Sequence, residues 1–258
     1  MKPPILHRRG IPFFYEKTKA EYHKDPYERY DEMVVKQSVI HLADTVWKGY
    51  PMQAIFDFAE NHYPTDSKSK NNILELGCGV GRWIGTLAQG YPNANCWGID
   101  YSYQMLRRAS EFWMEGREIL MDLTRRGFTQ PLTVQGHQLK NLQLGLAKAE
   151  NLPFASNTQD LVLNSFLLDR LDDPSKGLQE MHRVLKPNGK LVLVTPLNFH
   201  KASHWQTYYP PIKLSLILTQ IGFSILDWQE EIIIKEPMDF HGNAVTWRCI
   251  GFVAIKMG

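Results

Sequence analysis

The strongest constraint on the fold is a short segment in which an aliphatic run meets three closely spaced glycines. Residues 73–76, Ile-Leu-Glu-Leu, have the composition of a buried parallel strand, and Gly77, Gly79 and Gly81 follow at once. Glycine adopts positive φ readily and has no side chain to hold a ligand away from the backbone. The segment therefore predicts a strand, a tight turn on which a ligand can lie, and a helix over residues 83–89.

A second short run, residues 96–100, ends in a carboxylate. Asp100 follows Gly81 by 19 positions, the separation expected for an acid that accepts hydrogen bonds from two ribose hydroxyls. A dinucleotide fingerprint would need glycine at position 82, where this chain has Arg82. The pattern favours a nucleoside site over a pyrophosphate site, and over glycines that only make a tight turn.

The remaining patterns extend this unit into a sheet. Aliphatic runs at residues 142–147, 161–163 and 190–194 alternate with helical or polar stretches, which is typical of parallel strands. A helical pattern over 212–221 precedes two long strand patterns, 224–234 and 245–256, separated by a turn around His241-Gly242-Asn243. We expect an α/β Rossmann-like three-layer sandwich whose mostly parallel seven-stranded sheet ends in an antiparallel hairpin.

The first part of the chain differs from the sheet region. Residues 1–30 are basic, aromatic and proline-rich, which predicts an irregular arm, and residues 30–62 show the apolar spacing of two helices broken near 49–51. We expect one domain, 1–258, in which residues 1–70 cover the substrate and residues 71–258 form the catalytic core. The stretch between Ser110 and Leu142 is long enough for an extra helix beside the site, with Arg125-Arg126 at a solvated helix end.

Composition excludes several classes of protein. The formal charge of +2, from 29 basic and 27 acidic residues, supplies no field that would attract nucleic acid. Three cysteines without CxxC spacing predict neither a disulfide framework nor a metal site, and they fit a cytoplasmic protein. The charged, proline-containing start is unlike a signal peptide, and no run reaches the roughly 18 apolar residues of a membrane helix.

Several segments, in the same order, resemble the motifs of a known family. ILELGCGVGRW is similar to the first motif of class I methyltransferases and GIDYSYQML to their second, while AENLPFASNTQDLVLNSFLLDRLDDP and HRVLKPNGKLVLVTP are similar to the rest of the core. The resemblance covers about residues 72–196 and implies that S-adenosyl-L-methionine is the cofactor and S-adenosyl-L-homocysteine the product. It departs from the family at Lys148, where an aspartate is common, and at Asp169-Arg170, where two histidines are common.

The resemblance also implies a role for individual residues. Gly77 and Gly79 would approach the methionine and ribose portions, Glu75 would orient the amino group, and Asp100 would bind the ribose. Asn164, at the end of the fourth strand, would line the reaction chamber. The cofactor-binding residues so implied are Glu75, Gly77, Cys78, Gly79, Gly81, Asp100, Tyr101, Met105, Ala149, Glu150 and Asn164, of which Tyr101, Met105, Ala149 and Glu150 would lie near the adenine.

Methyl transfer from a sulfonium is a single in-line displacement, so the protein must align the acceptor and exclude water. A base is needed only for a weakly acidic hydroxyl, and His200 and His204, which follow the fifth strand, are the candidates by location. We expect a small-molecule acceptor methylated on oxygen or nitrogen. The alternatives are an RNA or protein methyltransferase, an inactive cofactor-binding subunit, and an aminopropyl transferase of the same fold.

Overall fold

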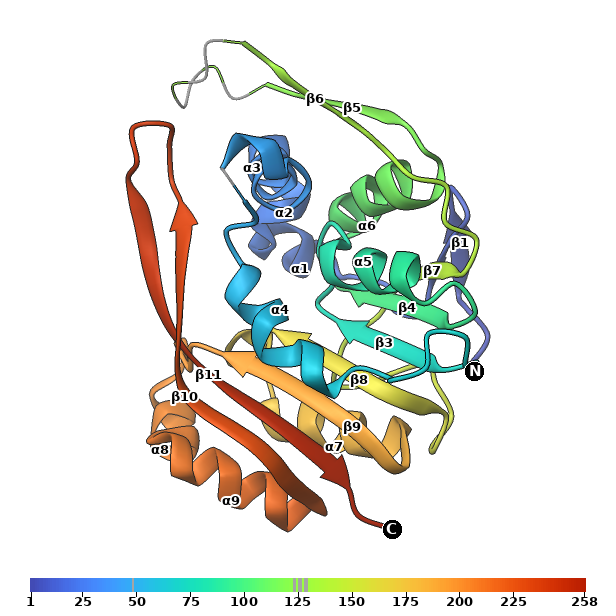
Figure 1. Ribbon diagram of the computed structural model, residues 1–258, viewed down its shortest axis with the longest axis vertical. Coiled ribbons are helices and arrows are strands. Elements are labelled where there is room, and N and C mark those ends of the chain that lie inside the picture. Colours follow the sequence, from blue (N-terminus) through green and yellow to red (C-terminus); the bar gives the residue numbers. More distant parts are fainter. Residues whose placement is uncertain (48, 123, 125–126, 128–129) are drawn as a thin grey trace.

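The computed structural model describes residues 1–47, 49–122, 124, 127 and 130–258. Its main sheet is built from β1 (Leu6–Arg8), β2 (Ile11–Phe13), β3 (Asn72–Leu76), β4 (Asn95–Asp100), β7 (Leu142–Leu146), β8 (Gln159–Ser165), β9 (Leu185–Thr195), β10 (Phe223–Pro237) and β11 (Ala244–Lys256). Within the described residues these nine strands lie in the order β1-β2-β7-β4-β3-β8-β9-β11-β10. Figure 1 shows the sheet between two layers of helices.

The pairing confirms the expected α/β class. Strands β7, β4, β3, β8 and β9 are parallel, whereas β11 runs antiparallel to both β9 and β10 and closes that edge as a hairpin. These seven strands are the predicted Rossmann-like sheet. Because the parallel strands share one direction, the glycine turn after β3 and the acid that ends β4 lie at the same edge of the sheet.

The amino-terminal arm is not irregular throughout, so this expectation was wrong for the strands within residues 6–13 and for the helices at 19–24 and 26–29. Arg9 and Gly10 both have positive φ and make a tight turn between β1 and β2. Ile11 and Phe13 are buried, and β2 pairs with β7 in parallel. The proline at position 12 does not prevent this, because β2 pairs with β7 only at Phe13 and lies one strand from the edge of the sheet.

The helices are α1 (Lys19–Lys24), α2 (Pro26–Arg29), α3 (Asp31–Leu42), α4 (Gln53–Ala59), α5 (Arg82–Gly90), α6 (Tyr103–Ala109), α7 (Pro174–Val184), α8 (Ala202–Tyr208) and α9 (Pro211–Ile221). The predicted break between α3 and α4 is confirmed, and the helix expected at 83–89 is α5. Figure 1 shows α5 and α6 on one side of the sheet and α7 and α9 on the other.

Alternation along the strands divides the core in two. Ile73 belongs to the apolar cluster on the α5 and α6 side, and Leu74 to the cluster on the α7 and α9 side. By the same alternation Glu75 lies on the α5 side and Leu76 on the α7 side. A site at the carboxyl ends of these strands therefore rests on two packed layers.

The segment between Ser110 and Leu142 differs from expectation. A π-helical turn, Ser110–Met114, continues α6, and the antiparallel strands β5 (Glu118–Met121) and β6 (Leu132–Gln135) follow instead of an extra helix. The reason is a period of two, because Ile119 and Met121 are buried while the residues between and before them are exposed. Arg125 and Arg126 lie outside the described residues.

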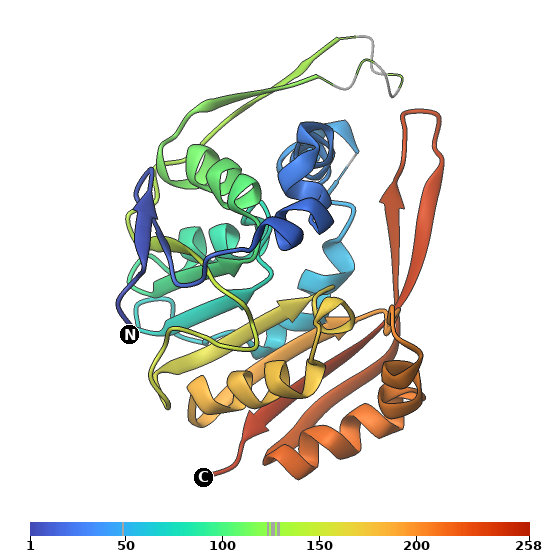
Figure 2. The same cartoon turned by 180° about the vertical axis from the view of Figure 1, so that it is seen from behind.

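A group of three helices and two hairpins projects beyond the carboxyl edge of the sheet. Figures 1 and 2 show α1 to α3 between the β5-β6 hairpin and the upper half of the β10-β11 hairpin. The arm is anchored by a hydrogen bond from the Phe14 amide to the Leu146 carbonyl, 2.8 Å long, at the end of β7. Among the described residues no helix is long and apolar enough to cross a membrane.

Candidate cofactor site

The turn after β3 has the backbone conformation that its glycines predict. Gly77, Gly79 and Gly81 all have positive φ. A Cβ atom at Gly79 would lie 3.2 Å from the Cε atom of Met105, and one at Gly81 would lie 3.0 Å from the ring of Trp113. A side chain at Gly79 or Gly81 would crowd Met105 or Trp113, so the turn favours glycine. We call the backbone of Gly77, Gly79 and Gly81 the cradle.

Asp100 closes this turn. Its Oδ2 accepts the backbone N–H of Gly79 at 2.8 Å, and its Oδ1 accepts the N–H of Ser102 at 2.7 Å. Burial raises the pKa of the Asp100 carboxyl, while these two N–H donors oppose the rise. A carboxylate has about four lone-pair positions, so two remain for the hydroxyls of a ribose.

Glu75 occupies the amino terminus of α5. The side chain is buried, and its Oε2 accepts the N–H of Ile84 at 2.9 Å. Burial raises the pKa of Glu75 well above its usual range, and the nearby Asp100 raises it further. A helix terminus already filled by a carboxyl cannot cradle a pyrophosphate, whereas two neighbouring carboxyls suit a cationic ligand.

The amino-terminal arm covers the residue that follows Asp100. The ring of Tyr101 packs against Tyr15, with centroids 6.0 Å apart, and the ammonium of Lys17 lies 4.0 Å from the Tyr101 centroid. Lys148 donates to Glu21 of α1 at 2.7 Å, which ties the arm to the segment after β7. Burial, together with the Glu21 carboxylate, raises the pKa of Tyr101.

The other residues expected at the adenine are placed as follows. Met105, in α6, is buried with its Cε against Gly79. Ala149 is buried in the cluster on the α7 side. Glu150 accepts the backbone N–H of Asp172 at 3.2 Å, so it also holds the loop before α7. No ligand contact tests these roles, and they stay predictions.

Asn164 is a buried amide without a protein partner. Its side chain is fully buried at the end of β8, and neither Oδ1 nor Nδ2 makes a hydrogen bond within the described part of the chain. Asn164 pairs in register with Leu76, the residue before the glycine turn. Burying an amide without hydrogen-bond partners is costly. A ligand that bonds the Asn164 amide would remove this cost.

The two candidate bases lie in the segment after β9. His200 is exposed, and its Nε2 lies 2.6 Å from a guanidinium nitrogen of Arg170. His204, in α8, packs edge-on against Phe199 and Tyr208. The side chain of Asp169, beside Arg170, is buried; burial raises the pKa of its carboxyl, and Thr195 donates to it at 3.2 Å.

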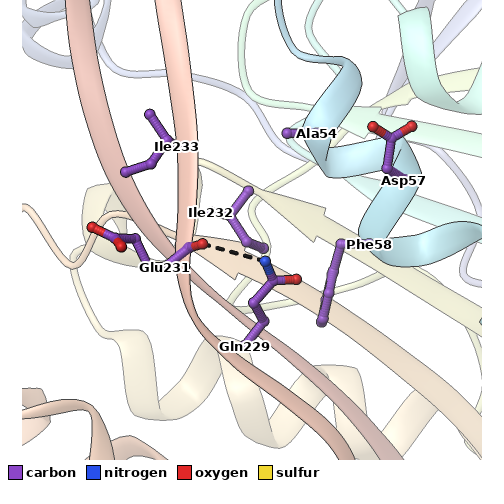
Figure 3. Close-up of a pocket in the computed structure, with 7 residues that line it drawn as sticks. All are labelled: Ala54, Asp57, Phe58, Gln229, Glu231, Ile232 and Ile233. Carbon is purple, nitrogen blue, oxygen red and sulfur yellow. Dashed lines mark hydrogen bonds between the residues drawn. The ribbon is translucent and has the colours of Figure 1, made fainter.

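Two recesses on the surface of the described residues lie elsewhere. One is bounded by α4 and by β10 where its register with β11 shifts, and Figure 3 shows the Gln229 amide donating to the Glu231 carbonyl beside Phe58. A second lies between Trp47 and the turn of the β10-β11 hairpin. Neither is lined by the glycine turn or Asp100, so they do not belong to the cofactor site. The described residues contain no cluster of three metal-ligating side chains.

The contacts of three charged residues near the site were missed by the sequence interpretation, which noted Arg82 and Lys148 only as departures from known motifs. Arg82 makes two 2.8 Å hydrogen bonds to Asp44, which joins the turn after α3 to the start of α5. Lys17 and Lys148 belong to the arm contacts described above. No local pattern could have found them, because each acts on a residue distant in the sequence.

The fit with S-adenosyl-L-methionine can be judged from these observations. The cradle at Gly79, the free lone pairs of Asp100 and the unpaired amide of Asn164 all lie at one edge of the sheet. Asp100 with the turn would hold the ribose, and Glu75 would face the positively charged methionine end. The residues present therefore fit the cofactor, which when bound supplies an electrophilic methyl group.

Comparisons with known proteins agree with the geometry. A methyltransferase domain family matches residues 74–193. The demethylmenaquinone methyltransferase of Geobacillus sp. WCH70 is 26% identical over 236 residues, covering 86% of this chain and 91% of the relative. The malonyl-[acyl-carrier protein] O-methyltransferase of Alcanivorax borkumensis is 30% identical over 177 residues, covering 64% of this chain and 52% of the relative.

The fold is likewise shared with solved structures. A SAM-dependent methyltransferase from Aquifex aeolicus superimposes with a TM-score of 0.52 at 21% identity, covering 88% of this chain and 98% of that one. The matched family segment contains the glycine turn, Asp100 and Asn164. Residues 74–193 are a methyltransferase domain, and the chain is an enzyme with the fold of class I S-adenosylmethionine-dependent methyltransferases whose cofactor is S-adenosyl-L-methionine.

Proposed function

We propose that the enzyme methylates a small molecule, on oxygen or nitrogen, in a chamber between the arm and the carboxyl edge of the sheet. The observation that carries this proposal is the aromatic wall on the acceptor side. Phe166, just after β8, packs edge-on against Trp247 of β11, with centroids 5.7 Å apart, and the Trp247 indole donates to Glu236 at 2.9 Å. Aromatic faces suit a planar acceptor.

Tyr27 of α2 supports the same placement. Burial is the first cause that raises the pKa of its phenol, followed by the charges of Asp100 and Glu236, while Arg170 lowers it. The ring therefore lies within electrostatic range of the ribose acid on one side and of the acceptor-side charges on the other. In our proposal Tyr27 roofs the chamber, and α2 excludes water from it.

The cofactor contacts in this proposal are those implied by the family resemblance. Glu75, Gly77, Cys78, Gly79, Gly81, Asp100, Tyr101, Met105, Ala149, Glu150 and Asn164 would surround the nucleoside and methionine portions. The protein would hold the methyl carbon in line with the acceptor atom, which needs orientation rather than a covalent intermediate.

A base is required only if the acceptor is a hydroxyl of ordinary acidity. His200 and His204 stay our candidates, and His200 is the better placed because Arg170 fixes its ring. In that contact the guanidinium donates and Nε2 accepts, so Nδ1 carries the proton of the neutral ring. His200 would act as a base through Nε2 only after Arg170 turns toward the acceptor.

We also propose that residues 1–258 work as one domain, with 1–70 as the substrate cover. The contacts of Lys17 and Lys148 with Tyr101 and Glu21 support this division of labour. The three cysteines are free and buried, which supports a cytoplasmic location. The names of the two relatives, a demethylmenaquinone methyltransferase and a malonyl-[acyl-carrier protein] O-methyltransferase, support an acceptor that is a small molecule or a small acyl group carried on a protein.

The first experiment is calorimetric titration with S-adenosylmethionine and S-adenosylhomocysteine, with NAD as the control. The purified enzyme is then incubated with methyl-labelled cofactor and separate panels of phenols and quinols, carboxylates, amines, RNA and protein. Label on a small molecule supports the proposal. Label on RNA or protein alone, or cofactor binding with no transfer to any panel, would replace it by one of the alternatives.

A further inference from the structure

Lys17 is a buried cation in the arm. Only 1% of its side chain is exposed, and its ammonium lies 2.6 Å from Asp25 and 3.3 Å from Glu28. Burying an ammonium is costly unless it is paired, so these two carboxylates account for its presence. The same ammonium also lies over the Tyr101 ring, 4.0 Å from the ring centroid. Pairing with the two carboxylates does not by itself require this contact.

The two carboxylates continue the connection to the site. Glu28 Oε1 accepts the backbone N–H of Tyr103 at 2.6 Å, and Asp25 accepts the N–H of Tyr27 at the start of α2. Asp100 lies in the field of the same group, where Lys17 lowers and Asp25 raises the pKa of its carboxyl. The arm therefore brings one positive charge to the segment that binds the nucleoside.

We propose that Lys17 is a positioning residue of the cofactor site: its ammonium fixes the Tyr101 ring and, through Glu28, the backbone at Tyr103, on the segment that follows Asp100. The other groups that face Lys17 are Asp25 and Glu28 and, from α1, the ring of Tyr22 at 5.5 Å. Glu75 faces Asp100 from β3. Lys17 is the positive charge among these acids, so its loss leaves the backbone N–H donors of Gly79 and Ser102 as the groups that oppose the rise in the pKa of Asp100.

The direction of the pH effect follows. An ionised Asp100 accepts hydrogen bonds from both ribose hydroxyls, and the protonated acid loses part of that capacity. Affinity for S-adenosylhomocysteine therefore falls as pH falls through the pKa of Asp100. Because Lys17 lowers that pKa, its removal makes the fall begin at a higher pH.

The experiment measures S-adenosylhomocysteine affinity by calorimetry from pH 5 to pH 8.5 in wild type, Lys17→Met, Lys17→Arg and Glu28→Gln, with urea unfolding of each. We expect Lys17→Met to weaken binding at pH 6, by about tenfold, and to weaken it less at pH 8. Lys17→Arg keeps the charge and restores the wild-type profile. Glu28→Gln, whose amide oxygen still accepts the Tyr103 N–H, lowers stability without raising the pH at which affinity begins to fall. We call this falling part of the affinity profile its acid limb.

Lys17→Met leaves two acids unpaired and can unfold the arm, so the double variant Lys17→Met/Glu28→Gln removes one acid together with the ammonium. The proposal requires the raised acid limb in this variant too. A wild-type profile in the double variant, or equal profiles in Lys17→Met and Glu28→Gln, would show that Lys17 only packs the arm. The inference rests on the cofactor assignment, and failure of the wild type to bind S-adenosylhomocysteine would instead refute that assignment.

Discussion

Asp100 and Gly79 are joined by a 2.8 Å hydrogen bond in which the glycine amide donates to the carboxylate. The acid that ends one strand thus holds the turn that follows its neighbour in the sheet. The residue expected to bind the ribose also fixes the shape of the turn on which the nucleoside is expected to lie. Substitution at this position therefore alters both the contact and the turn.

Asp100→Asn should weaken S-adenosylhomocysteine binding by about 100-fold. One carboxylate oxygen is replaced by an NH2 group, which cannot accept a hydrogen bond, and the charge of the other oxygen is lost. Hydrogen bonds to a charged acceptor contribute about 1.5–3 kcal/mol each. Calorimetry at pH 7.5 measures the affinity, and urea unfolding measures the accompanying loss of stability, about 1–3 kcal/mol.

Asp160→Asn is the matched control for this variant. Asp160 also accepts a backbone N–H, that of Asn72, and pairs with Lys186. It lies at the amino-terminal end of β8, away from the candidate cofactor site. The control should lose stability and keep its affinity for S-adenosylhomocysteine. If both variants lose affinity in proportion to stability, Asp100 has only a structural role.

Two glycines should respond differently to alanine. A Cβ at Gly177, in α7, would lie 2.4 Å from the Leu171 side chain, so Gly177→Ala should cost about 1–3 kcal/mol of unfolding free energy through overpacking and leave the affinity of the folded enzyme unchanged. A Cβ at Gly79 would meet only the flexible end of Met105. Gly79→Ala should cost about 1–2 kcal/mol through its positive φ and should also impair cofactor binding. The opposite ranking of affinities in calorimetry would contradict the cradle.

Asn164→Leu should stabilise the protein while it impairs function. The side chains are similar in size, and removing a buried amide without partners should raise the free energy of unfolding by about 1 kcal/mol. Urea unfolding tests the stability, and label transfer from S-adenosylmethionine tests the activity. A loss of more than about 1 kcal/mol would mean that the amide is satisfied within the folded chain.

His41 should make stability depend on pH. Burial lowers the pKa of this ring to about 4, Arg82 lowers it and Glu236 raises it. Nδ1 lies 2.7 Å from the Tyr50 hydroxyl and Nε2 3.1 Å from Gln37 Oε1, which suits the neutral ring. The unfolded chain takes up a proton near pH 6.5 and the folded chain does not, so stability falls as pH is lowered from 6.5 toward 4.

The contribution of His41 is at most about 3 kcal/mol, and less to the extent that water reaches the ring. The difference in unfolding free energy between wild type and His41→Gln, measured in urea at pH 7.5 and pH 5, isolates it from the other titrating groups. A difference that does not change between the two pH values would show that the His41 ring takes up a proton at pH 5 as readily in the folded chain as in the unfolded chain.

The sheet could be predicted because its signals are local. The runs at 73–76 and 96–100 identify buried strands by composition, and the glycines between them require a turn with positive φ. The segment between Ser110 and Leu142 misled the interpretation because its period-two alternation covers only four residues in each strand. So short a pattern does not distinguish a hairpin from a helix.

The sequence by itself determined the Rossmann-like sheet, the glycine turn and the acid opposite it, since these depend on backbone freedom and on alternation within a few residues. Only the tertiary structure decided that Lys17 lies over Tyr101, that Arg82 bonds Asp44, and that Asn164 has no partner. These relationships join segments far apart in the chain. They follow from which surfaces pack together to bury apolar area and pair charges, and a local pattern does not encode that choice.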